Sequence, residues 1–271
     1  MFKPLGYSIK FFNAIATLMV GYLANLGFPR LGEVLRPIAL SNYEKIAVEK
    51  AAGTVVAERA LDVLMLLLFI ILALTLEYDT LWSYIQENQA LADKIIGIFT
   101  SPLFYILILA LSITGFVVLR SRWFRNSKLW YRIVEMLKGF ADGLISILKL
   151  ERPIIFILHT LFIWLMYFLM TRLCFYAFEP TAALSLSSGL MVFVLGTLGF
   201  VFPSPGGMGS YHALIMAALA IYGVDQTDAF TLANILFFTI QIFCNLLFGL
   251  MAYVLLPIYN KNYEGALSTK N

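Results

Sequence analysis

The chain has 271 residues, of which 61% are hydrophobic and 13% are charged. Soluble domains average roughly 45–50% apolar and about 25% charged residues, so this composition excludes an ordinary soluble protein. The formal net charge of +3 is too small to indicate a nucleic-acid partner. Several apolar stretches reach the roughly 20 residues that cross a bilayer, without the alternation of a β-barrel. We therefore predict an all-α, polytopic membrane helical bundle.

The first apolar segment, residues 11–27, ends in Gly-Phe-Pro-Arg. A short return helix is expected over residues 33–40, followed by a polar loop at residues 41–50. Glycine and proline interrupt helical hydrogen bonding, and the freed backbone groups must be satisfied by protein or water rather than by lipid. We interpret residues 1–52 as a first broken, re-entrant segment with its cytoplasmic loop.

The middle region, residues 53–183, is predicted to hold three spanning helices, at 53–76, 102–119 and 153–178. The acidic stretch 77–100 is expected to be an external loop. Residues 120–132 contain five Lys or Arg and no acidic residue. The positive-inside rule places this loop, which extends over 120–152, in the cytoplasm. Its residues 133–150 have the amphipathic pattern of a helix that lies along the membrane interface.

The region 184–258 is predicted to form a second broken segment and a last helix. Its apolar segments 184–202 and 208–222 are separated by a break that contains Pro203, Pro205, Gly206, Gly207 and Gly209. The last helix is expected over about 230–257, and the basic tail 259–271 favours a cytoplasmic C-terminus.

The two broken segments share a pattern, Gly-x-Leu followed by Phe-Pro-x-x-Gly, at residues 21–32 and again at 196–206. The predicted topology makes the first segment enter from the cytoplasm and the second from outside, as in an inverted repeat. Paired interrupted helices mark substrate sites in transporters. The alternative is that glycine and proline kinks, common in membrane helices, match by chance. We predict one domain of about six to seven membrane segments.

Charged residues follow the first break at helical spacing: Arg30, Glu33 and Arg36. Arg30 or Arg36 would bind a lipid phosphate, because guanidinium pairs bidentately with phosphate, while Glu33 orients an arginine. The alternative is membrane anchoring with a local salt bridge.

A second charged cluster, Glu58, Arg59 and Asp62, begins a spanning helix. Ionisable residues are costly inside a membrane, so they usually face a bundle interior and form pairs, here Arg59 with Asp62. The alternative is an ion-pair cluster that stays in headgroup water.

The Pro/Gly break exposes backbone amides at the start of the next helix, a general anion site to which Ser204 and Ser210 would add hydroxyl donors. His212 could titrate near neutral pH, although a lone histidine beside a turn is more often a packed residue.

No sequence signature of an enzyme is found: there is neither a metal-ligand cluster nor a phosphate-binding glycine loop. We expect no catalytic residue, cofactor or metal. An intramembrane enzyme that uses Glu58, Asp62 and His212 is a weaker alternative, since no nucleophile and base can be placed.

Three runs, GYLANLGFPRLGEVLRP, VEKAAGTVVAERALDVL and FPSPGGMGSYHALIMAAL, occur in this order. With them the chain resembles the lysylphosphatidylglycerol synthase transmembrane region family of flippase-like membrane proteins. In bifunctional members this region is implicated in moving aminoacylated phospholipid between leaflets, and a separate soluble domain transfers the amino acid. The resemblance implies a stand-alone lipid-handling membrane protein without that soluble domain.

The resemblance assigns the cluster at residues 30–36, the cluster at residues 58–62 and the Pro/Gly turn to the family's motifs. His212 stands where many relatives carry a carboxylate, which puts an acid-based role there in doubt. Relatives usually have more hydrophobic sequence before residues 3–7, so we expect that one or two helices precede this chain in them.

We predict a cell inner membrane protein that binds and translocates an anionic or aminoacylated phospholipid, or a polyprenyl-linked lipid, between leaflets. The alternative is a membrane scaffold that presents a lipid substrate to a separately encoded transferase. A homo-oligomer is compatible with the sequence.

Overall fold

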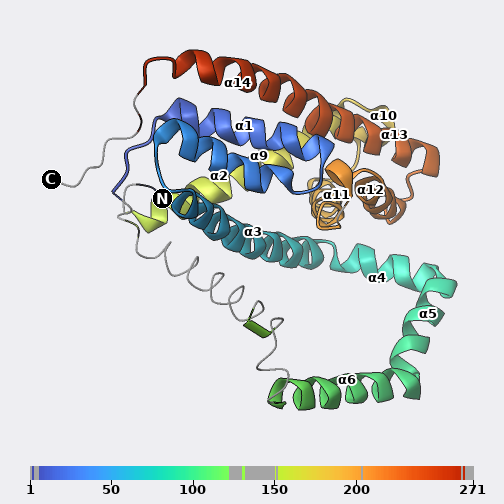
Figure 1. The fold of residues 1–271 in the computed structure, drawn as a ribbon. Helices are drawn as coiled ribbons and strands as arrows, with labels where there is room; N and C mark the ends of the chain where they lie inside the picture. The colour runs from blue at the N-terminus through green and yellow to red at the C-terminus, as the bar shows by residue number, and fades with distance from the viewer. Residues whose placement is uncertain are drawn as a thin grey trace. The chain divides into compact units, whose positions relative to one another are not determined.

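The computed structural model describes residues 2, 6–121, 130–131, 150, 152–202, 204–263 and 265. The chain divides into two compact units, Met1–Glu77 with Gly143–Asn271, and Tyr78–Asp142, which are described separately (Figure 1). Every regular element of the described residues is a helix. The predicted interfacial helix, most of the basic loop and Pro203 lie outside the described residues.

The first broken segment is a helical hairpin made of α1 (Phe11–Gly27) and α2 (Leu31–Glu44). At 1.5 Å per residue these helices are about 25 Å and about 21 Å long, shorter than the hydrocarbon core of a bilayer. The chain reverses at Arg30, whose φ is 63°. Residues 41–44, predicted as loop, are helical, because buried Glu44 holds the end of α2 with several hydrogen bonds.

Two glycines allow this hairpin to close. A Cβ atom on Gly32 would overlap the carbonyl oxygen of Gly21, so only glycine permits this approach of α1 and α2. The Gly32 amide also donates to Asn25 Oδ1 over 2.7 Å.

The second broken segment is also a hairpin, made of α11 (Leu186–Gly199), the short helix η2 (Pro205–Gly207) and α12 (Ser210–Ala220). Its turn needs glycine, because φ is positive at Gly206, Gly207 and Gly209. These helices have 14 and 11 residues, so neither crosses a bilayer alone.

Three helices of this unit are long and apolar enough to span a membrane. They are α3 (Val48–Leu76), α9 (Pro153–Tyr176) and a continuous stack of α13 (Gln226–Leu236), the π-helix η3 (Phe237–Cys244) and α14 (Asn245–Tyr259). The short helix α10 (Glu179–Ala182) follows α9. Helix α3 begins five residues before the predicted start, because its first turn packs Ala51 into a cluster with Leu40 and Ile46.

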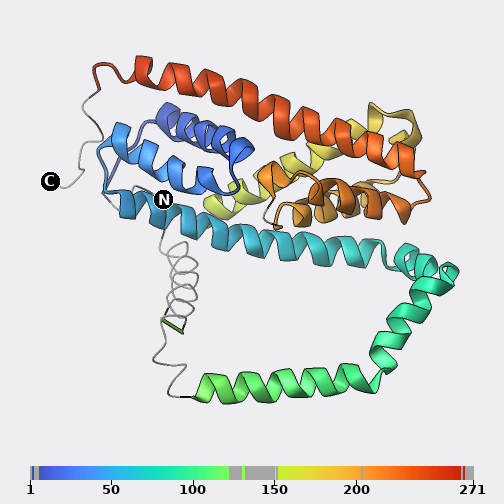
Figure 2. The same ribbon diagram turned by 45° about the vertical axis from the view of Figure 1, so that its right-hand side comes forward.

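The two hairpins enter this unit from opposite ends, and their tips meet (Figures 1 and 2). At one end, here called the Glu44 end, the Asn13 and Asn260 amides pair the start of α1 with the end of α14. At the other, the Glu77 end, burial and the neighbouring Glu77 carboxylate raise the pKa of Tyr222, which follows α12. Between them, Arg30 Nη2 donates to the Val201 carbonyl over 3.5 Å. This arrangement agrees with the predicted inverted pair.

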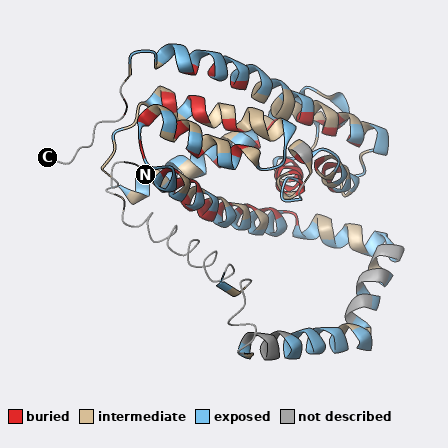
Figure 3. Ribbon diagram, viewed as in Figure 1, coloured by how far each residue is buried: buried red, intermediate tan, exposed pale blue. Residues whose placement is uncertain are grey.

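The core lies where α9, α11, α12 and α13 pack, with Phe175, Ile215 and Leu232 fully buried. Figure 3 shows buried residues on the inward face of α3 and exposed residues on the opposite face. Only 17–22% of the most apolar window of each spanning helix is buried. The exposed remainder is apolar, as expected of a surface that faces lipid.

The smaller unit contains α4 (Tyr78–Glu87), α5 (Gln89–Thr100) and α6 (Pro102–Arg120). The prediction of a loop over 77–100 was therefore wrong, since two helices occupy it. Helix α4 is stabilised by the stacked rings of Tyr78 and Trp82, four residues apart and 6.5 Å between centroids. The predicted helix at 102–119 is confirmed.

Candidate functional site

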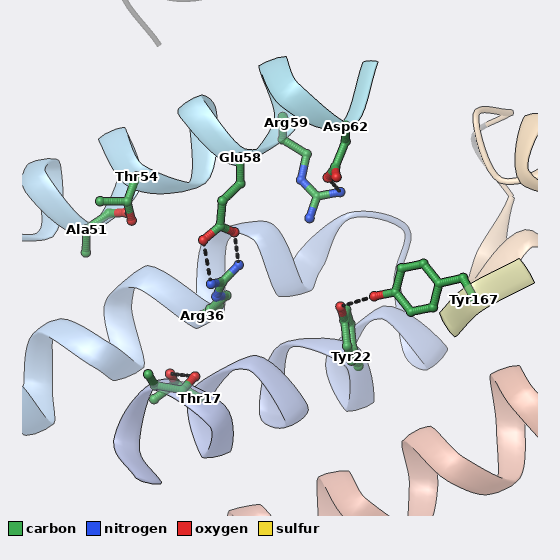
Figure 4. A network of polar contacts seen from close by, with 10 residues as sticks. Thr17, Tyr22, Arg36, Ala51, Thr54, Glu58, Arg59, Asp62 and Tyr167 are labelled. Atoms are coloured by element: carbon green, nitrogen blue, oxygen red, sulfur yellow. Dashed lines mark hydrogen bonds and ion pairs between the residues drawn. The ribbon is translucent and has the colours of Figure 1, made fainter. Parts of the chain in front are cut away.

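A small cavity lies where the first hairpin packs on α3. Figure 4 shows the polar contacts that α1, α2 and α3 make in this region. Its volume is about 20 Å³, room for about one water molecule. The lining comes from α1, α2 and α3: Leu18, Gly21, Tyr22, Asn25, Gly32, Glu33, Arg36, Val55 and Arg59. Three of these residues, Glu33, Arg36 and Arg59, are among those that the sequence singled out.

Arg36 on α2 forms a two-pronged ion pair with Glu58 on α3, with N–O distances of 2.5 and 3.0 Å. The side chains are 18% and 30% exposed, so the pair is largely removed from water. Sequence reasoning grouped Arg36 with Glu33, yet the carboxylate that holds the guanidinium comes from the other cluster. The structure thus joins the two predicted clusters into one site.

Asp62 forms an ion pair with Arg59, three residues earlier in α3, with 3.2 Å between Oδ2 and Nη1. The helical spacing predicted this pair. The other carboxylate oxygen of Asp62 accepts a hydrogen bond from the indole of Trp164 on α9, also over 3.2 Å. Trp164 is buried between Phe69 of α3 and Phe193 of α11, with ring centroids 5.5 and 6.1 Å away. This aromatic packing fixes the donor that orients Asp62.

Two tyrosines that sequence reasoning missed lie beside this cluster. The hydroxyl groups of Tyr22 on α1 and Tyr167 on α9 are 3.4 Å apart (Figure 4). Tyr22 also lines the cavity. Tyrosine is common in membrane helices, so only the fold distinguishes these two from the other tyrosines of the chain.

Glu33 lines the same cavity, and no ion pair is found for it among the described residues. Together with the paired residues it gives the site three carboxylates and two guanidinium groups. Arg30 is not a lining residue; it is exposed at the hairpin tip and contacts Val201. The two arginines predicted to bind phosphate are therefore separated.

The hydroxyl groups of the Pro/Gly turn bond within the turn. Ser210 Oγ donates to the Gly199 carbonyl over 2.7 Å and lies 3.0 Å from Ser204 Oγ. The His212 ring packs against Phe237, with centroids 4.8 Å apart. The short helix η2 of the turn lies against α1. Neither η2 nor His212 lines the cavity between the first hairpin and α3.

A buried carboxylate at the Glu44 end was also missed. Glu44 accepts hydrogen bonds from the Lys10 amide, from Asn13 Nδ2 and from the Tyr263 hydroxyl, over 3.0, 2.6 and 2.7 Å. Burial and the bond to Glu44 raise the pKa of Tyr263 to about 12. Glu44 fastens α1, α2 and the segment after α14 to one another, and so fixes the base of the first hairpin.

The chain was compared with known proteins. The model of the lysylphosphatidylglycerol synthase TM region matches residues 1–249. The chain belongs to this family. It is also similar to a UPF0104 membrane protein of Methanothermobacter thermautotrophicus, with 26% identity over 229 residues, which cover 78% of this chain and 65% of that relative. No solved structure matches. The membership confirms the resemblance and the membrane location, and the matching model describes a transmembrane region rather than a catalytic domain.

Proposed function

We propose that the protein binds the headgroup of an anionic or aminoacylated phospholipid between the first hairpin and α3, and moves it between leaflets. The observation that carries this proposal is the joined cluster of Arg36, Glu58, Arg59 and Asp62 around a cavity among membrane helices. Charged groups at such a position are costly, and they commonly mark a substrate path.

The charge balance supports a headgroup that carries both signs. Arg59 lines the cavity with a half-exposed side chain, so its guanidinium can bind a phosphate. Glu33 of α2, which lines the same cavity, can bind an ammonium group. A phosphate alone would have three carboxylates near it, whereas an aminoacylated headgroup would find a partner for each charge.

The cavity is too small for a headgroup in this conformation, since it holds about one water molecule. Entry of a headgroup requires that the first hairpin moves away from α3 or from α9. The contacts that must open are the Arg36–Glu58 pair and the Tyr22–Tyr167 contact. Two hairpins that enter from opposite ends offer one moving element for each leaflet.

The chain's last described residues lie at the Glu44 end, beside Asn260. We propose that the protein lies in the cell inner membrane with a cytoplasmic C-terminus. In this orientation the Glu44 end faces the cytoplasm. The cavity would then receive its headgroup from the cytoplasmic leaflet.

The test is lipid scrambling in liposomes that contain the purified protein, with fluorescent phospholipids and a quencher that cannot cross the bilayer. We expect loss of protected fluorescence with wild type, and at least tenfold slower loss with Arg36→Ala. Lys261→Ala, which removes an exposed cation after α14, is the matched control and should behave as wild type.

Phosphatidylcholine, phosphatidylglycerol and aminoacylated phosphatidylglycerol are compared as the labelled lipid. The mixed-charge site predicts the fastest movement for the aminoacylated lipid. Unchanged protection with folded protein and all three lipids would reject translocation and favour a scaffold that presents lipid to a separate transferase.

A further inference from the structure

A second buried cation lies at the Glu77 end, outside the proposed lipid site. Arg172 of α9 is 93% buried, at 7% relative exposure. Its Nη2 donates to the Leu184 carbonyl over 2.7 Å, and its guanidinium stacks 4.4 Å from the Tyr176 ring. Its Nε and Nη1 are buried without a hydrogen-bond partner.

Arg172 also lacks a compensating charge. In the part of the chain that the structure describes, both ion pairs lie elsewhere, at Arg36–Glu58 and Arg59–Asp62. A buried guanidinium with unused donors is unfavourable unless an acceptor is supplied. The Arg172 side chain packs closely against the backbone of Gly189 on α11. A Cβ atom at Gly189 would lie only 3.1 Å from Arg172 Cδ.

Nη2 of Arg172 contacts the residue that precedes the N-cap of α11, and the N-terminus of a helix carries positive potential. Leu184 directly precedes the N-cap Ser185, whose hydroxyl accepts from the Ser188 amide. The amides of Leu186 and Ser187 open the helix, and the first amides of a helix have no acceptor within it. An arginine and a helix N-terminus thus bring two groups that favour an anion to the same place.

We propose that Arg172 and the first amides of α11 bind an anionic oxygen group, a phosphate, at the Glu77 end. The phosphate would accept from one of the two unpartnered nitrogen atoms of Arg172, because the Nε and Nη1 hydrogens point in different directions, and from the opening amides of α11. Tyr176 covers the guanidinium but is itself 62% exposed, so rotation of its ring opens the site. This site is separate from the cavity at Arg36 and does not depend on lipid movement there.

The test measures thermal unfolding of the full chain in an Arg59→Gln background, so that the Arg36 cavity contributes little. One arm adds inorganic phosphate in detergent, with chloride at equal ionic strength as control. The other compares nanodiscs of phosphatidylglycerol in phosphatidylcholine with nanodiscs of phosphatidylcholine alone. We expect saturating anion to raise the Tm by about 5 °C in at least one arm.

The second substitution then assigns the effect to Arg172. Arg172→Gln should reduce the rise to below about 1 °C, whereas Arg172→Lys, which keeps the charge, should retain part of it. A rise with phosphate alone identifies a free anion as sufficient, and a rise only with phosphatidylglycerol identifies a lipid headgroup; both support the site. The proposal is overturned if the Tm rises in neither arm, or if it rises equally with Arg172→Gln. If Arg172→Gln does not fold, the result with Arg172 intact and with Arg172→Lys still decides.

Discussion

The two helical hairpins have the same helix–turn–helix architecture but differ in their charged side chains. The first, residues 11–44, carries four charged side chains: Arg30, Glu33, Arg36 and Glu44. The second, residues 186–220, carries no Asp, Glu, Lys or Arg. The shared Phe-Pro-x-x-Gly pattern therefore marks a chain reversal in both hairpins, but neither the same turn conformation nor the same charged side chains.

This difference suggests a division of labour. The first hairpin supplies most of the residues that line the cavity, and the second packs into the apolar core. The hairpins touch at their tips, where Arg30 contacts Val201. Trp164 links the second hairpin to α3, because it contacts both Phe193 and Asp62. If the function depends on the first hairpin alone, substitutions that break these contacts should not change lipid movement.

The largest expected effect comes from the charge of the first hairpin. Glu58→Ala leaves Arg36 largely buried without its carboxylate. Removal of one partner from a buried pair costs about 3–5 kcal/mol, and the partial exposure of Glu58 reduces this to about 3 kcal/mol. We expect a matching loss of unfolding free energy together with loss of lipid movement. Denaturation of the purified protein measures the first, and the scrambling assay the second.

Glu49→Ala, which removes an exposed carboxylate from the first turn of the same helix, is the control and should leave both quantities unchanged. If the two variants lose similar stability, the Arg36–Glu58 pair is a surface contact and the first hairpin is not held by its charges.

The next effect tests the geometry that the hairpins share. Gly32→Ala would place a Cβ on the Gly21 carbonyl, and Gly199→Ala would place one 2.6 Å from Tyr211 Cα. Overpacking of this kind costs about 1–3 kcal/mol, so both variants should unfold at lower temperature. Only Gly32→Ala should also slow lipid movement, because Gly32 lines the cavity.

Gly53→Ala is the matched control within α3, since its Cβ would meet nothing within 4 Å. It should stabilise the protein by about 0.5–1 kcal/mol, because alanine replaces glycine inside a helix. Equal slowing by Gly32→Ala and Gly199→Ala would show that both hairpins must move and would break the division of labour.

The sequence predicted the helices and breaks well and the partners within the site poorly. Hydrophobic runs and Gly/Pro breaks are local signals, and they placed both hairpins and the three helices that are long and apolar enough to span; the helix predicted at 102–119 is present, but it is not among those three. An ion pair within one helix, such as Arg59 with Asp62, could be predicted from the helical spacing of its residues. Arg36 with Glu58 and the Glu44 network join residues 22 to 219 positions apart, so they depend on packing that no local pattern encodes.

The smallest expected effect sharpens the comparison most, because it tests the link between the second hairpin and the site. Trp164→Phe keeps an aromatic ring between Phe69 and Phe193 but removes the donor to Asp62. A hydrogen bond to a charged group contributes about 1.5–3 kcal/mol, and Asp62 retains Arg59 as partner, so the lower figure applies. We expect lipid movement to slow about tenfold and the Tm to fall by about 3–6 °C.

Trp82→Phe, at an exposed position of α4, controls for loss of a tryptophan and should leave lipid movement unchanged. If Trp164→Phe slows lipid movement tenfold and the Tm falls by only a few degrees, the orientation of Asp62 matters for function and not only for packing. The second hairpin would then act on the site through Phe193 and Trp164, since it contributes no charge of its own. If movement is unchanged, Asp62 is held sufficiently by Arg59, and the second hairpin affects transport only through the contact of the tips.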